Sequence, residues 1–314
     1  MNYIIEKIKE YNRIIIHGHQ RPDGDCMGSQ FGLKGIINAS FPEKEVYVVG
    51  ETSQYVSFVG KVDTIDDSLF EGALSIIVDT GNSERISDKR YTLSKETIKI
   101  DHHIRIEDYA DYNYVDEESP ACAQIIAELW SKYLLDITPE GATALYVGIL
   151  TDTGRFKYRG VCRKTMNLAG MLLDQNVDIE EIDRKLSIET LNTIKLKAEV
   201  LSNFHTTPDG FAYAVVTRET IKKFNVSNEE AASMVSLLAN IEDHPVWALI
   251  IEYENDIRVR LRSSGPDVDL LANAYNGGGH AKASGASLPS FDDLERFAND
   301  CNELVRQYKA NKNK

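Results

Sequence analysis

Residues 13–25, which read RIIIHGHQRPDGD, decide the fold of the first half of the chain. Arg13 to Ile16 form a short apolar run without polar alternation, which is typical of a strand buried on both faces of a parallel sheet. His19, Asp23 and Asp25 follow where this strand ends, in a turn rich in proline and glycine. Open α/β sheets build ligand sites at the carboxyl ends of their strands. Taken alone, the pattern is explained equally well by an acidic surface loop with helix-capping aspartates.

Three further apolar segments end in acidic or histidine residues: Asp79 after 73–78, Asp101-His102-His103 after 97–100, and Asp152 after a predicted helix over 139–150. Taken alone, Asp79 reads as an ordinary turn aspartate. The triplet Asp101-His102-His103 is less well explained by a solvated loop than by a functional role. A helix dipole is negative at the carboxyl end, so Asp152 calls for a nearby cation there.

Together these clusters offer enough carboxylates and imidazoles for two metal ions that share one bridging carboxylate. Because no sulfur is among them, they suit a hard or borderline cation such as Mn²⁺ or Mg²⁺. Paired metals serve in-line displacement at phosphorus. The clusters therefore predict hydrolysis of phosphoesters.

The order of segments predicts an α/β protein with two domains. Strands and helices alternate in the first half, which favours a mostly parallel, doubly wound sheet. After a helical stretch, the second half of the chain has an α+β pattern, with a strand, a helix over 228–241, a hairpin and a closing helix. The predicted division is a catalytic domain over 1–185, a helical linker over 186–208 and a smaller α+β domain over 209–314.

Composition narrows the substrate and the compartment. The net charge is −14, whereas a protein that holds a long nucleic-acid backbone usually has a basic face. A phosphate-bearing substrate is therefore expected to be small. The four cysteines are scattered, which favours free thiols in a reducing cytosol. The start of the chain does not read as a signal peptide, and no apolar run approaches the roughly 20 residues that span a bilayer. We expect a cytoplasmic protein without a membrane partner.

Two features of the second domain could hold a phosphate. Arginines at 258, 260 and 262 alternate with apolar residues, so they share one face of a strand. A solvated sheet face explains Arg258, whereas Arg262, followed by Ser263-Ser264, suits a phosphate clamp. The run Gly277-Gly278-Gly279-His280 would let the backbone approach a phosphate or a base closely. A flexible surface turn is the alternative for the glycine run.

Four segments of the chain resemble the motifs of the DHH phosphoesterases: His19-x-x-Pro22-Asp23-x-Asp25 with Gly28-Ser29, Asp79-Thr80, Asp101-His102-His103 and Asp152-Thr153-Gly154. The glycine run, with Ala283-Ser284-Gly285, resembles the DHH-associated C-terminal domain. The resemblance spans nearly the whole chain and is greatest to members that combine nanoRNase and 3'-phosphoadenosine 5'-phosphate (pAp) phosphatase activities. One departure is Cys26-Met27, which stands where other small residues are expected.

The resemblance implies two Mn²⁺ ions, with Mg²⁺ or Co²⁺ as substitutes. His19 and Asp23 would hold one ion, Asp25, His102 and Asp152 the other, and Asp79 would bridge them in the catalytic centre. The catalytic His103 would contact the scissile phosphate or protonate the leaving oxygen. The residues implied in substrate binding are Arg262, Ser264, Gly278, Gly279 and His280. The active site would lie in a cleft between the domains, and the resemblance suggests a homodimer.

The substrates expected on this basis are pAp, short oligoribonucleotides or the linear dinucleotides of cyclic-dinucleotide pathways, rather than a long duplex. A family II inorganic pyrophosphatase shares the metal motifs, but the glycine run belongs to the nucleotide-handling branch. A nucleotide sensor without catalysis is a second alternative. Such a sensor would lack a metal ligand, and all six are present in the sequence.

Overall fold

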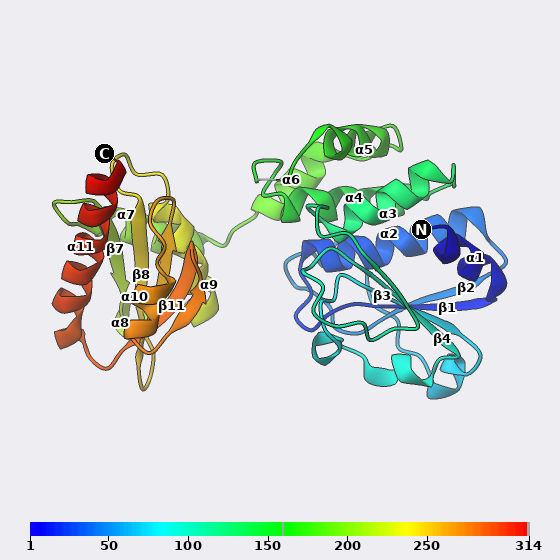
Figure 1. The fold of residues 1–314 in the computed structure, drawn as a ribbon, viewed down its shortest axis with the longest axis horizontal. Coiled ribbons are helices and arrows are strands. Elements are labelled where there is room, and N and C mark those ends of the chain that lie inside the picture. Colours follow the sequence, from blue (N-terminus) through cyan, green and yellow to red (C-terminus); the bar gives the residue numbers. More distant parts are fainter. Residues whose placement is uncertain (159, 313–314) are drawn as a thin grey trace. The chain divides into compact units, whose positions relative to one another are not determined.

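The computed structural model describes residues 1–158 and 160–312, and it divides into two compact units, Met1–Ile188 and Glu189–Lys314 (Figure 1). In the described part of the chain, no helix is both long and apolar enough to cross a membrane.

A five-stranded sheet forms the centre of the first unit. Its order is β2-β1-β3-β4-β5, and every neighbouring pair is parallel. This order places a topological switch point between β1 and β3, because the chain leaves β1 toward one side and later continues on the other. The strands are β1 (Arg13–His17), β2 (Glu45–Val49), β3 (Leu74–Val78), β4 (Glu96–Asp101) and β5 (Tyr112–Val115).

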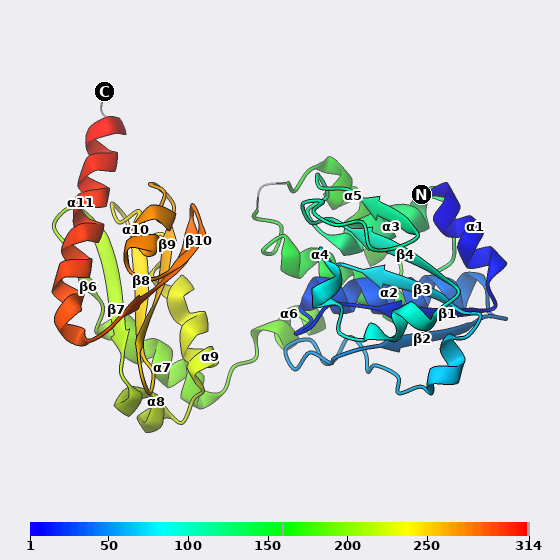
Figure 2. The same ribbon diagram turned by 60° about the horizontal axis from the view of Figure 1, so that its bottom comes forward.

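Helices cover one face of this sheet, and the other face has a lighter cover (Figures 1 and 2). The helices share the main apolar core with the sheet, whereas Phe70 and a few neighbours fill a small core on the opposite face. Short 3₁₀ helices lie in the connections on that side: η1 (Asp67–Phe70), η2 (Ser83–Arg85) and η3 (Lys89–Leu93). The α-helices of the unit are α1 (Asn2–Glu10), α2 (Gly24–Ser40), α3 (Cys122–Lys132), α4 (Pro139–Asp152), α5 (Arg163–Leu173) and α6 (Ile179–Ser187).

Helices α2 and α4 cross unusually closely because glycines line their contact. A Cβ placed on Gly28 would lie 2.6 Å from the carbonyl oxygen of Ala144 and 2.7 Å from the Cα of Gly148. Asp25 lies on the first turn of α2, and Asp152 ends α4. This close crossing therefore helps to set the separation of two candidate ligands.

The second unit is built on a six-stranded mixed sheet of order β10-β11-β9-β8-β7-β6, in which only β7 and β8 pair in parallel. One apolar core packs against α7, α9 and η4, and a second packs against α10 and α11 on the other face. The strands are β6 (His205–Thr206), β7 (Phe211–Val216), β8 (Val246–Glu252), β9 (Ile257–Ser263), β10 (Gly278–His280) and β11 (Ala283–Leu288). The helices are α7 (Leu191–Ser202), α8 (Arg218–Phe224), α9 (Asn228–Ser233), η4 (Met234–Leu238), α10 (Asp269–Ala274), η5 (Phe291–Asp293) and α11 (Leu294–Lys312).

The structure confirms the α/β class, the parallel first sheet and the separate α+β unit, and it differs in local detail. The helix expected over 228–241 splits into α9 and η4, which ends at Leu238. Helix α7, expected within a linker, packs Leu196 and Val200 into a core of the second unit. The glycine run forms the edge strand β10 rather than a surface turn. Glycine is required at Gly277, where a Cβ would lie 1.9 Å from the carbonyl oxygen of Gly285.

Candidate active site

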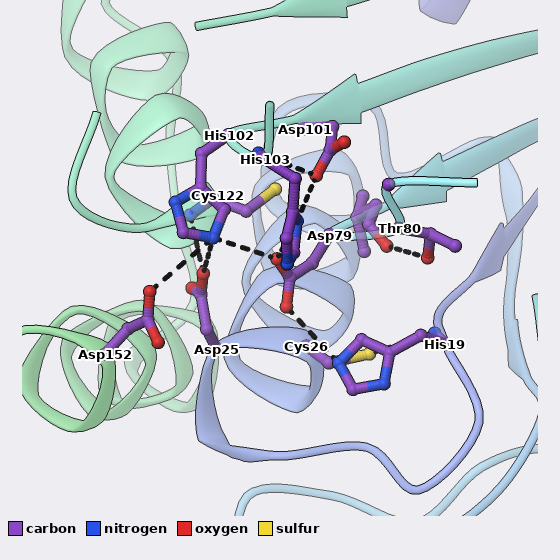
Figure 3. Close-up of polar contacts among 12 residues, drawn as sticks. His19, Asp25, Cys26, Asp79, Thr80, Asp101, His102, His103, Cys122 and Asp152 are labelled. Atoms are coloured by element: carbon purple, nitrogen blue, oxygen red, sulfur yellow. Dashed lines mark hydrogen bonds and ion pairs between the residues drawn. The ribbon is translucent and has the colours of Figure 1, made fainter. Parts of the chain in front are cut away.

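The predicted ligands converge at the carboxyl ends of β1, β3 and β4, next to the switch point of the first sheet (Figure 3). His19 follows β1, Asp79 follows β3 directly, and His102 follows β4 directly. Asp25 comes from the first turn of α2, and Asp152 from the last residue of α4. The structure therefore brings together side chains from five elements that are spread over residues 13–152.

A first cluster comprises His19, Asp23 and Asp79. The Nε2 atom of His19 lies 3.7 Å from Oδ1 of Asp23 and 3.5 Å from Oδ2 of Asp79. The Nδ1 atom of the same ring lies 2.9 Å from the carbonyl oxygen of Gln20, to which it donates. This hydrogen bond holds the ring so that Nε2 is directed at the carboxylates. Metal-binding histidines are commonly oriented by such a partner on the other ring nitrogen.

A second cluster comprises Asp25, Asp79, His102 and Asp152. The Nε2 atom of His102 lies 3.6 Å from Asp25, 3.3 Å from Oδ1 of Asp79 and 3.5 Å from Asp152. Its Nδ1 atom lies 3.1 Å from the carbonyl oxygen of Ser119, so its Nε2 is also directed inward. Both histidines therefore present the same nitrogen to a group of carboxylates.

The backbone of α3 fixes the carboxylate of Asp25. The amide of Cys122 donates to Oδ2 at 2.6 Å, and the amide of Ala123 donates to Oδ1 at 2.8 Å. These groups belong to the amino end of α3, where free N–H groups and the helix dipole favour an anion. Asp25 is therefore held in place by backbone groups of the protein alone.

Asp79 belongs to both clusters and has an unusual backbone. Its φ is +52°, in the left-handed region that non-glycine residues seldom adopt. The side chain is 2% exposed, and Oδ1 has no hydrogen-bond partner among the described residues. Strained backbone and unpartnered buried polar atoms are concentrated at functional sites.

The pKa values of the histidines and of two of the aspartates in these clusters are raised, because the carboxylates are largely buried and lie close together with little positive charge beside them. Burial lowers the pKa of His19, but hydrogen bonds to its carboxylate partners outweigh this effect and raise it. Burial opposes the charge on His102 too, yet Asp79 and Asp25 raise its pKa to about 10. Burial, followed by the charge of Asp79, raises the pKa of Asp25 well above its usual value. Burial and neighbouring carboxylates raise the pKa of Asp152 to about 6, although His102 opposes this. Oxygen and imidazole donors in this arrangement fit divalent cations.

His103 lies beside the clusters and is oriented by Asp101. Its Nδ1 atom lies 2.8 Å from Oδ1 of Asp101, and its side chain is partly exposed. Asp101 is fully buried and forms an ion pair with Lys99 at 3.2 Å. The Asp101 carboxylate therefore holds Nδ1 of His103 and leaves Nε2 available for proton transfer.

Sequence reasoning did not identify Lys99 and Cys26. Lys99 is fully buried in β4, where its Nζ donates to the carbonyl oxygens of Gly81 (2.9 Å) and Glu107 (3.2 Å). A lysine within an otherwise apolar strand was the available signal. Cys26 is fully buried, and burial raises the pKa of its thiol to about 11. In the sequence, Cys26 stands where the motif has another small residue, and no local pattern indicates its contact with His19 and Asp79.

The predicted substrate residues lie in the second unit. Arg258 and Arg260 are exposed, while Arg262 is partly buried and donates to the carbonyl oxygens of Leu261 (2.9 Å) and Ser284 (3.4 Å). Gly278, Gly279 and His280 form β10. Strand β10 pairs with β11, and β11 pairs with the part of β9 that contains Arg262. The Ser264 hydroxyl donates to the carbonyl oxygen of Pro245 at 3.4 Å.

Comparison with known proteins agrees with this geometry. Residues 13–149 match the DHH family, N-terminal domain, and residues 209–307 match the DHHA1 domain. The chain therefore belongs to the DHH family, in a form that also carries a DHHA1 domain.

Its relatives include the bifunctional oligoribonuclease and PAP phosphatase NrnA of Bacillus subtilis, which is 36% identical over 97% of this chain and 98% of that protein. A probable NrnA of Streptococcus mutans is 37% identical over 96% of this chain and 98% of that protein. A crystal structure of an exopolyphosphatase-related protein from Bacteroides fragilis has a TM-score of 0.83 and 26% identity, covering 97% of each chain.

Proposed function

We propose that this chain is a dinuclear-metal phosphoesterase that hydrolyses very short oligoribonucleotides to mononucleotides and pAp to AMP. The observation that carries the proposal is the pair of ligand clusters that share the buried carboxylate of Asp79. The names of the relatives, which span the same length of chain, support the two substrates.

We assign His19 and Asp23 to one cation and Asp25, His102 and Asp152 to the other, with Asp79 between them. Mn²⁺ is the proposed ion, and Mg²⁺ or Co²⁺ are substitutes, because the predicted ligands are oxygen and imidazole nitrogen. Such a pair supplies an activated water and offsets the charge on the attacking and leaving oxygens.

His103 is the proposed proton donor to the leaving oxygen. Its Nδ1 is held by Asp101, so Nε2 is the nitrogen that faces a substrate. The buried Lys99 forms an ion pair with Asp101. Its Nζ also donates to the carbonyl oxygens of Gly81 and Glu107, so it ties the loop after β3 to the loop after β4. A proton donor is effective when it is held at hydrogen-bond distance from the atom that receives the proton.

Arg262, Ser264, Gly278, Gly279 and His280 are proposed to bind the terminal phosphate or the base. Arg262 supports this assignment because its guanidinium makes only two hydrogen bonds among the described residues and so keeps donors for a phosphate. The acidic net charge favours a short substrate over a long duplex. These substrates suit a cytoplasmic enzyme, and a homodimer remains part of the proposal.

The test is a parallel assay of the purified protein with Mn²⁺ on pAp, on a diribonucleotide, on a long single-stranded oligoribonucleotide and on pyrophosphate. We expect the diribonucleotide and pAp to be cleaved fastest. Faster cleavage of pyrophosphate would favour an inorganic pyrophosphatase. Binding of pAp without turnover would favour a nucleotide sensor.

A further inference from the structure

A cysteine lies inside the first cluster. Ligand atoms of His19, Cys26 and Asp79 lie within 4.8 Å of one another, and the three side chains are 4%, 0% and 2% exposed. Figure 3 shows the sulfur of Cys26 beside the imidazole of His19. The cluster thus contains sulfur as well as the oxygen and nitrogen donors predicted from the sequence.

A second observation points to a ligand at this place. The buried carboxylate of Asp79 joins both clusters: Oδ2 lies 3.5 Å from Nε2 of His19, whereas Oδ1, which has no hydrogen-bond partner among the described residues, faces His102. The bond from Nδ1 of His19 to the carbonyl oxygen of Gln20 holds the ring with Nε2 directed at Oδ2 of Asp79. An imidazole nitrogen and a carboxylate that face each other, as Nε2 of His19 and Oδ2 of Asp79 do, can both bind one divalent cation.

The Cys26 sulfur makes two weak contacts among the described residues. Cys26 is the third residue of α2, and its own amide donates to the N-capping carboxylate of Asp23 at 3.1 Å. The backbone amide of His19 donates to Sγ at 3.3 Å. The thiol proton faces Oε1 of Gln30 at 3.8 Å, which is a weak contact that a stronger sulfur partner could replace.

We propose that Cys26 supplies a thiolate ligand to a thiophilic divalent cation, such as Cd²⁺ or Zn²⁺, at the position formed by His19 and Asp79. On binding, the S–H bond breaks, its proton passes to water, and a sulfur–metal bond forms without any change in oxidation state. Zn–S bonds in proteins are about 2.3 Å long, so Sγ turns from Gln30 toward the cation.

This ligand would let the first cluster distinguish cations by softness. Mn²⁺ and Mg²⁺ prefer oxygen and nitrogen, so they leave the thiol protonated and use the carboxylates. Cd²⁺ and Zn²⁺ recruit sulfur and therefore gain a ligand that the harder ions do not use. Cys26 thus makes this position a selective acceptor of soft cations.

The other cysteines provide matched controls. Cys122 is also fully buried near Asp25, but its Sγ donates to the carbonyl oxygen of Ile100 at 3.2 Å, and it is absent from the ligand groups. Cys162 is exposed, and Cys301 is buried in the core of the second unit. Cys122→Ser therefore removes a buried thiol from the same region without removing the proposed ligand.

The experiment titrates metal-free, reduced full-length protein with Cd²⁺ and follows the ultraviolet sulfur-to-cadmium charge-transfer band. We expect a saturable band in the parent and in Cys122→Ser, and no band at the same occupancy in Cys26→Ser. Cadmium affinity should fall by on the order of tenfold or more in Cys26→Ser, the scale of losses around metal ligands. Mn²⁺ affinity, measured by calorimetry, should change much less.

A band that persists in Cys26→Ser, or its absence from the parent at saturating Cd²⁺, would overturn the proposal. An equal loss of Cd²⁺ and Mn²⁺ affinity in Cys26→Ser would also overturn it, because it would indicate disruption of the cluster. Cys26→Ala serves as a second variant if the serine hydroxyl prevents folding, which circular dichroism reports. Since no substrate enters the measurement, the outcome is separate from that of the hydrolysis assay.

Discussion

The two oxygens of Asp79 face different histidines: Oδ2 lies 3.5 Å from Nε2 of His19, and Oδ1 lies 3.3 Å from Nε2 of His102. One side chain therefore connects two clusters that are otherwise built from separate elements. Its left-handed backbone, at the end of β3, directs the carboxylate to this position.

Asp79→Asn should abolish hydrolysis while the protein stays folded. Asparagine tolerates the left-handed φ and keeps the shape of the side chain, but its amide cannot bridge two cations. Turnover of pAp and thermal denaturation of the apo-protein measure the two effects. Unchanged turnover would rule out the bridging role. Asp79→Ala is the less informative variant, because its backbone would be strained.

Removal of divalent metal should lower the melting temperature. Burial, and then the charge of neighbouring carboxylates, raises the pKa of Asp25 and Asp152, and bound cations would offset the repulsion among these carboxylates. A ligand at 100 times its Kd stabilises the folded state by about 2.7 kcal/mol. Calorimetric scans with a chelator and with added Mn²⁺ test this, and Asp79→Asn should show a smaller difference. Identical scans for the parent would contradict two bound ions.

Lys99→Met should reduce stability and turnover together. The change leaves the Asp101 carboxylate buried without its cation, and breaking a buried pair costs about 3–5 kcal/mol. It also loosens the group that orients His103, so kcat should fall more than KM rises. Denaturant unfolding and steady-state kinetics measure the two effects.

Two further variants serve as controls for Lys99→Met. Lys99→Met combined with Asp101→Asn should recover part of the stability without recovering kcat, because the buried charge is gone but His103 loses its carboxylate. Arg105→Ala removes a neighbouring exposed ion pair with Asp108 and should change little. Wild-type kcat in Lys99→Met would refute the positioning role.

Gly28→Ala should destabilise the first unit by about 1–3 kcal/mol, the usual effect of overpacking. The new methyl group would meet the backbone of α4 at Ala144, which cannot move independently of Asp152. Gly170→Ala is the matched control, since it lies within helix α5 with no heavy atom inside 4 Å. Helix propensity predicts that this control is neutral or stabilising. Equal effects of the two changes, measured by urea denaturation, would contradict the packing argument.

Arg262→Gln should raise KM for pAp more than it lowers kcat, because the arginine is proposed to hold a phosphate distant from the reacting bond. Arg258→Gln changes the same strand face but removes an exposed pair with Asp256, so it should leave KM unchanged. An unchanged KM in Arg262→Gln would remove that residue from the substrate site.

Elements that depend on local sequence could be predicted, whereas elements that depend on contacts with distant segments could not. Strands β1, β3 and β4 are short apolar runs with polar residues at their ends, so both the strands and the clustering of the polar side chains that follow them were predictable. Strand β10 consists of glycine and histidine, and only its close approach to β11 makes it a strand. The roles of Lys99 and Cys26 depend on partners from other segments, namely Gly81 and Asp79, and no local pattern indicates such contacts.

The amide contacts of Asp25 have a consequence for synthesis of the chain. Asp25 depends on Cys122 and Ala123, about a hundred residues downstream, and its cluster is completed only by Asp152. On the ribosome, the His19 and Asp79 side chains are therefore made well before the second cluster can assemble. Under the proposal of two cations, both positions would be complete only after α3 and α4 have docked, so metal loading would follow synthesis of the chain as far as Asp152.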